Sequence, residues 1–118
     1  MIFDLFLLFL FKINVASVTW ITTTEHDFGT VRTRTEACCE FRFRNTSAAA
    51  IAIDNVRTSC GCAAPDWSAT PVPPDSTGVI KIAYFSRSTG RFEKKIKVWL
   101  HGIRRPETLT IRGNVSDE

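Results

Sequence analysis

Residues 37 to 44 read Ala-Cys-Cys-Glu-Phe-Arg-Phe-Arg, and this stretch decides the fold class because its side chains alternate in character. The odd positions are apolar, and the even positions from Glu40 onward are charged. Successive side chains of a β-strand point to opposite faces, so the pattern predicts a strand with one face on a core and the other in water. It places Cys39 inward and Cys38 outward.

The same alternation recurs downstream of the Asn-Thr-Ser turn at residues 45–47, and it predicts further strands at residues 50–56, 78–85, 92–100 and 109–115. Residues 78–85 carry apolar side chains on both faces, so we expect this strand to be covered on both sides. A short turn ending at Gly90 separates it from the next strand, and this spacing predicts a hairpin.

Residues 65–78 hold four of the five prolines. Proline lacks the N–H that a central strand must donate. We therefore expect this segment to be an ordered extended loop.

With about seven short strands and no long helical stripe, the sequence predicts an all-β fold, an antiparallel immunoglobulin-like β-sandwich. The whole of residues 18–118 is expected to form this single domain. A chain of 118 residues can bury enough apolar surface to fold without cross-links.

The composition is that of an ordinary globular protein, with 44% hydrophobic and 23% charged residues, which argues against a disordered chain or a polytopic membrane protein. The net charge is only +3, and the basic residues alternate with other types along the predicted strands. This pattern is typical of a solvated strand face, so no nucleic-acid partner is expected.

Residues 1–17 are expected to be a signal peptide, because an apolar run of eleven residues precedes Lys12 and is too short to span a bilayer as a helix. Asp4 in this run is unusual for a signal, so the alternative is an apolar first strand or helix of the domain. Cleavage would leave a chain that starts near Val18, located in the periplasm or at the cell surface, with no stable membrane anchor.

Cys60, Gly61 and Cys62 allow three kinds of chemistry. Two thiolates this close suit Cu(I), and Zn²⁺ would need further ligands. They could also form a readily reduced disulfide. The third role is structural, as buried thiols or as disulfides drawn from Cys38, Cys39, Cys60 and Cys62, and a bond between the two pairs would close a loop worth roughly 3 kcal/mol.

No catalytic constellation is visible in the sequence. The only histidines are His26, beside the turn-forming residues Asp27 and Gly29, and His101, at a predicted strand end. Neither lies in a nucleophile elbow, a metal-binding helix motif or a phosphate loop. We therefore expect no enzyme activity.

Motifs spread over residues 26–115 resemble one family of exported bacterial proteins, the domain of unknown function 1573 family. They begin with His-Asp-Phe-Gly at 26–29 and include Ser-Cys-Gly-Cys at 59–62. The residues that carry the resemblance are His26, Asp27, Phe28, Gly29, Asn45, Cys60, Gly61, Cys62, Trp67, Gly90, Phe92 and Gly113.

The resemblance implies an immunoglobulin-like sandwich related to the Hydin-type domains, an exported protein and no established activity. Two features depart from the family pattern. Asp75 stands where the family turns on a glycine, and the Cys38-Cys39 pair occupies a strand where aliphatic residues are expected.

These observations favour a non-catalytic module that binds an envelope protein or a glycan, or that forms part of an envelope assembly. The alternative is a copper-binding or thiol-redox protein that uses Cys60 and Cys62.

Overall fold

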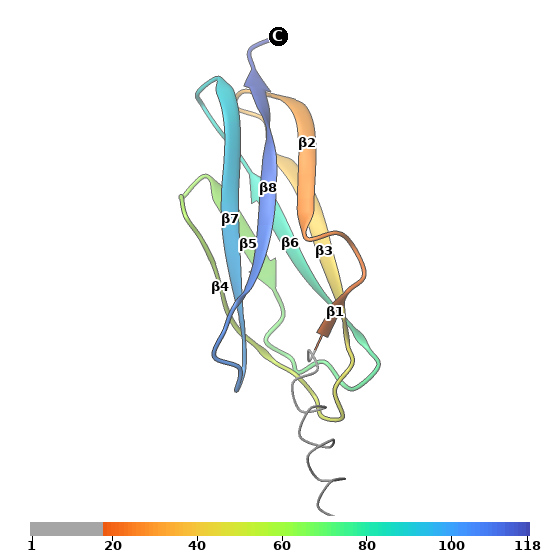
Figure 1. The fold of residues 1–118 in the computed structure, drawn as a ribbon. Coiled ribbons are helices and arrows are strands. Elements are labelled where there is room, and N and C mark those ends of the chain that lie inside the picture. The colour runs from red at the N-terminus through yellow and green to blue at the C-terminus, as the bar shows by residue number, and fades with distance from the viewer. Residues whose placement is uncertain (1–17) are drawn as a thin grey trace, which may run out of the picture.

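The computed structural model describes residues 18–118, which form eight β-strands (Figure 1). The predicted signal peptide at residues 1–17 lies outside the described residues. No helix in the described part of the chain is long and apolar enough to cross a bilayer. The strands are β1 (Val18–Trp20), β2 (Glu25–Arg32), β3 (Ala37–Asn45), β4 (Ile53–Thr58), β5 (Ala63–Trp67), β6 (Thr77–Tyr84), β7 (Gly90–Leu100) and β8 (Glu107–Ser116).

The strands form two four-stranded sheets that pack face to face as a sandwich (Figure 1). The first sheet has the order β1-β3-β6-β5, and the second has the order β2-β8-β7-β4. The all-β, immunoglobulin-like prediction is confirmed. The strand count is eight rather than about seven, and one strand pair is parallel.

The parallel pair arises because the chain changes sheets near its start. β1 runs antiparallel to β3, with Val18 opposite Asn45. The chain then crosses over, and β2 pairs with β8 in parallel from Glu25 onward. Alternation in the sequence predicts strands and faces but contains no signal for this crossing.

The alternation of residues 37–44 behaves as predicted. Phe41 and Phe43 are 1% and 0% exposed, Cys39 packs partly against the core, and Cys38 is exposed. Burial of a phenylalanine side chain contributes roughly 1.5–3 kcal/mol. The inward rows of the other strands complete the core, with Ile80 and Ile82 from β6, Ile96 and Val98 from β7, and Leu109 and Ile111 from β8.

The predicted hairpin between residues 78–85 and 92–100 is wrong. β6 belongs to the first sheet and β7 to the second, so the connection between them crosses the sandwich. β7 pairs instead with β8. Alternation fixes which residues face the core but not which neighbour supplies the hydrogen bonds.

β6 has one buried face only. Its outward residues Val79 and Ala83 are half-buried and Lys81 is exposed, so the prediction of cover on both sides is wrong. The strand predicted at residues 50–56 also starts later than predicted. Ile51 forms only an isolated bridge to Val72, and β4 begins at Ile53.

The proline-rich segment is only partly a loop, because its first residues form the end of β5, an edge strand. The Phe85 N–H donates to the Cys62 carbonyl, at 2.9 Å. Since main-chain polar groups alternate in direction along a strand, Ala64 also faces β6 and Pro65 faces away from the sheet. Pro65 therefore removes an N–H that would point into solvent, which is the one place where a strand tolerates proline.

We predict that Pro65→Val preserves the fold but increases self-association, because it restores a free N–H on an exposed edge. Sedimentation velocity over a concentration series measures this. Pro71→Val, in the loop after β5, is the matched control and should behave as the unchanged protein. Equal sedimentation of the two variants would show that Pro65 does not protect the edge.

Candidate functional site

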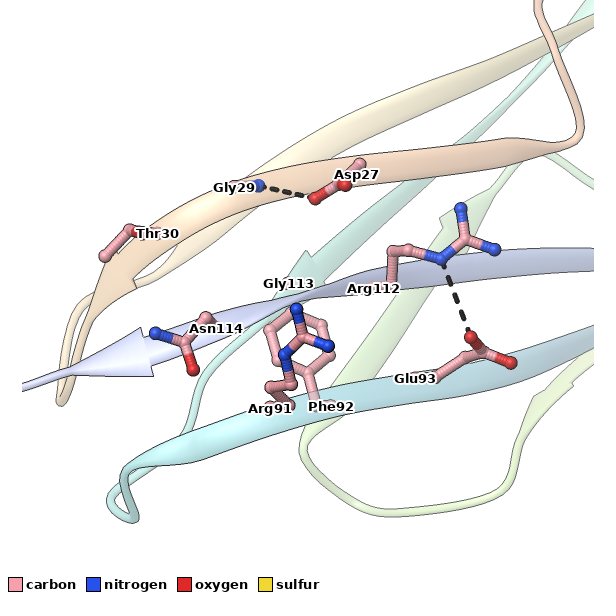
Figure 2. A pocket seen from close by; sticks show the side chains of 9 residues that line it. All are labelled: Asp27, Gly29, Thr30, Arg91, Phe92, Glu93, Arg112, Gly113 and Asn114. Carbon is pink, nitrogen blue, oxygen red and sulfur yellow. Dashed lines mark hydrogen bonds and ion pairs between the residues drawn. The ribbon is translucent and has the colours of Figure 1, made fainter.

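The candidate site is a hollow of about 600 Å³ on the outer face of the second sheet, over β2, β8 and β7 (Figure 2). Its lining comes from strands that lie next to each other in the sheet, so main-chain pairing sets the spacing of its residues. The lining residues are Asp27, Gly29, Thr30, Arg91, Phe92, Glu93, Arg112, Gly113 and Asn114.

A β-bulge shapes one wall of the hollow. The register between β2 and β8 shifts between Asp27 and Thr30, and Gly29 has a φ of 70°. The Gly29 N–H donates to Asp27 Oδ1 at 2.8 Å (Figure 2). Glycine adopts this left-handed conformation without strain. The sequence predicted a turn before the strand here, and the structure instead places the bulge inside it.

A close contact between two strands forms the floor. Gly113 lies opposite Phe92, and a Cβ atom on Gly113 would sit 2.8 Å from the Phe92 ring and 2.9 Å from the Gly29 carbonyl oxygen. The Phe92 ring also stacks on Tyr84 of the first sheet, with ring centroids 3.9 Å apart. This contact ties the two sheets together below the hollow.

Ion pairs fix the charged groups at one side of the hollow. Arg112 Nη2 donates to Glu25 Oε1 at 2.8 Å. Figure 2 shows the second pair, in which Arg112 Nε lies 3.5 Å from Glu93 Oε1. The hydrogen bond to Glu25 is the main cause that raises the pKa of Arg112. Arg91 and Asn114 have no side-chain partner among residues 18–118, so their polar groups are available to a ligand.

The lining supplies two carboxylates, two guanidinium groups, one amide and one hydroxyl, and it holds no cysteine, histidine or serine. These groups can hold a ligand by charge and by hydrogen bonds. Sequence reasoning missed Thr30, Arg91, Glu93, Arg112 and Asn114. The sequence indicates only that these residues occupy solvent-facing positions in strands whose side chains alternate in character.

The resemblance residues divide into separate groups. His26, Phe28, Phe92 and Gly113 meet under the hollow, where His26 and Phe28 form an edge-to-face pair with centroids 4.6 Å apart. His101 pairs instead with Asp54, at 3.1 Å.

Asn45 acts on the structure rather than on a ligand. It is fully buried, and its Nδ2 donates to the carbonyls of Ala49 and Val72, at 2.8 Å each. Asp75 has a φ of 66°, which a glycine would adopt without strain, and its N–H donates to the Asn45 carbonyl. Trp67, at the end of β5, packs partly against the core, and Gly90 begins β7.

Cys60 and Cys62 form a disulfide in the turn between β4 and β5, with Cα atoms 5.4 Å apart. Cys38 and Cys39 are free thiols, so the cross-link between the two cysteine pairs is absent. A ring of three residues contributes only about 1–2 kcal/mol in the chain-entropy model, less than the longer loop would. Residues 18–118 contain no group of three or more side chains placed to hold a metal ion.

We predict that Gly113→Ala destabilises the protein by about 1–3 kcal/mol, because the new methyl group overlaps the Phe92 ring and the Gly29 carbonyl. Urea unfolding measures the change. Gly61→Ala is the control, since a Cβ there meets no atom within 4 Å, and it should change stability by less than about 0.5 kcal/mol. Equal losses in both variants would contradict the packing account.

We predict that iodoacetamide modifies two thiols in the unreduced protein and four after reduction and unfolding. Cys38 should react first because it is exposed. Burial raises the pKa of Cys39 to about 11, so only about one molecule in a thousand carries the Cys39 thiolate at pH 8. Its rate should therefore keep rising up to about pH 11, and mass spectrometry follows both sites. Four modified thiols without reduction would contradict the disulfide.

Several solved structures share this fold. A PapD-like domain of human CEP192 superposes with a TM-score of 0.74 at 8% identity, over 86% of this chain and 87% of that one. A Porphyromonas gingivalis protein of unknown function gives 0.68 at 11% identity, over 86% of this chain and 50% of that one. The Pseudomonas aeruginosa CupB2 chaperone gives 0.62 at 13% identity, over 83% of this chain and 55% of that one.

At these identities the likeness concerns the fold alone. This chain spans about half the length of the last two proteins. A secreted serine protease and a glycoside hydrolase also contain such a domain, so the fold does not decide whether a chain is catalytic.

No curated protein matches the chain. Residues 19–115, however, match the family described as "Protein of unknown function (DUF1573)". Because the match spans most of the chain and agrees with the observed sandwich, this protein belongs to the DUF1573 family.

Proposed function

We propose that this protein is an exported, non-catalytic module that binds a partner protein through the hollow on β2, β8 and β7. The observation that carries the proposal is an open surface of mixed charge on the second sheet, with two polar side chains, Arg91 and Asn114, that have no side-chain partner among residues 18–118. Such surfaces gain specificity by matching the charges of a partner.

A protein partner fits better than a glycan. Sugar rings are generally held on an exposed aromatic face, and the one aromatic ring of the hollow, Phe92, stacks on Tyr84 and lies against Gly113. It therefore has no free face for a sugar. The remaining lining offers charged and amide groups, which match the polar rim of a protein interface.

Export is supported by two features that do not depend on each other. The first is the apolar run in residues 1–17, which has the length of a signal-peptide core. The second is the Cys60–Cys62 disulfide, since disulfides persist in oxidising compartments such as the periplasm and the cell surface. Nucleic acid is a poor partner for the hollow, because Asp27 and Glu93 lie beside its arginines.

A second candidate function is thiol exchange at Cys60 and Cys62, and the observed disulfide favours it over Cu(I) or Zn²⁺ binding. In such an exchange a partner dithiol is oxidised to a disulfide while the Cys60–Cys62 bond is reduced to two thiols. Metal binding would require both sulfurs to be free thiolates. The thiol count described above therefore separates the two, because a metal-holding pair has no disulfide to reduce.

The binding proposal is tested with a photo-crosslinking amino acid at position 114, inside the hollow, and at position 104, in the β7–β8 connection. Both forms of the full chain are expressed in a Gram-negative bacterium that carries a DUF1573 protein, and the cells are fractionated. We expect the protein in the envelope or periplasmic fraction and a discrete adduct from position 114 only. The same adducts from both positions, or retention in the cytoplasm, would contradict the proposal.

A further inference from the structure

One edge of the first sheet is open. β1 covers only the last residues of β3, from Phe43 to Asn45, and the chain then leaves for the second sheet (Figure 1). We propose that the uncovered part of β3, centred on Cys38 and Glu40, accepts an extended segment of a partner protein as an additional strand. This site is independent of the hollow, which lies on the other sheet.

The direction of the main-chain groups shows that this edge is free. The Asn45 N–H donates to the Ser76 carbonyl on the β6 side, whereas the Arg42 carbonyl accepts the Ile21 N–H on the β1 side. Main-chain polar groups alternate along a strand, and the β3–β6 register is unbroken. Cys38 and Glu40 therefore point away from β6. Within residues 18–118, no hydrogen bond reaches their main-chain groups from that side.

The other edges of the sandwich carry features that block an added strand. Pro65 removes the outward N–H from the middle of β5. On β4 the His101 N–H donates to the Ala52 carbonyl, and the register then shifts by one residue between Ile53 and Asn55. The shift turns Val56 outward, and its N–H is already bonded to Asn55 Oδ1 at 2.9 Å. β2 is kinked by the bulge at Gly29. Natural sheets use such features to prevent edge pairing, and β3 has none of them.

Apolar surface gathers at the same place. Ile21 is the one large hydrophobic residue of the described chain that is exposed, at 56%, and its N–H bonds to Arg42, next to the open stretch. Cys39 faces inward there and is only half-buried, and Phe28 and Val31 of β2 pack only partly against the core. An added strand would bury this surface, which is how apolar side chains add affinity to main-chain pairing.

The geometry also defines the occupant. Side chains opposite Cys38 and Glu40 would face water, and the one between them would face the core beside Cys39. The segment that fits is therefore short and extended, with one apolar residue flanked by polar ones, and with a basic residue opposite Glu40. A second copy of the chain fits less well, because its own β1 would meet the turn at residues 33–36 that precedes β3.

The proposal is tested by selecting displayed random nine-residue peptides against the whole protein and measuring the affinity of the enriched peptides by calorimetry. We expect the apolar-polar pattern given above among the enriched peptides. Glu40→Pro removes the outward N–H, as Pro65 does on β5, and should weaken binding at least about tenfold. Glu40→Thr, the matched control, keeps the N–H and should change binding less than threefold. Arg104→Ala, in the β7–β8 connection and outside both surfaces, should not change peptide binding.

NMR shift mapping on the unchanged protein provides a readout that does not depend on the variants. Peptide binding should shift the amides of Ile21, Cys38 and Glu40 most strongly. No enriched peptide, equal affinity for both Glu40 variants, or shifts confined to the hollow would overturn the proposal. Self-association that Glu40→Pro abolishes would assign the edge to a second copy and would equally overturn it.

Discussion

The structure depends on the crossing of the first strand from one sheet to the other. The crossing segment consists of three consecutive threonines, residues 22–24. Thr22 Oγ1 accepts the Arg42 N–H of the first sheet, and two residues later the Thr24 carbonyl accepts the Thr110 N–H of the second sheet. The crossing has two consequences. It leaves part of β3 without a neighbour, and it delivers β2 to β8 as a parallel strand with the bulge that shapes the hollow.

The two surfaces therefore have one origin, but as proposed binding sites they present different chemical groups to a partner. The hollow offers side chains, with Arg112 held by Glu25 and Glu93 and with Arg91 unpaired within the described part of the chain. The edge of β3 offers main-chain groups beside the partly buried apolar side chains of Cys39, Phe28 and Val31. Side-chain surfaces select by charge, whereas main-chain pairing selects an extended conformation. A module with both could hold a folded partner and a flexible segment together.

The sequence predicted what depends on side-chain character. Alternation in residues 37–44 placed Phe41 and Phe43 in the core and Cys38 outside, and the number of short strands predicted the sandwich, which the family resemblance also implied. The sequence did not predict which strands pair with each other. The false hairpin between β6 and β7 and the missed parallel pair both concern which strand supplies hydrogen bonds, a property that alternation does not encode. The prolines of residues 65–78 led to the prediction of a loop because a central strand cannot contain proline, but an edge strand can contain one where the nitrogen faces away from the sheet, as at Pro65. In the sequence, the charged residues that line the hollow are marked only by their solvent-facing positions in predicted strands.

Amide hydrogen exchange measured by NMR on the isolated protein tests the open edge of β3 most directly. The amides of Cys38 and Glu40 should exchange as fast as those of exposed loops. Those of Cys39 and Phe41, which face β6, should be slower by at least about 100-fold. If all four amides are equally protected, the edge is covered in solution, and the claim that the strand crossing leaves β3 open is wrong.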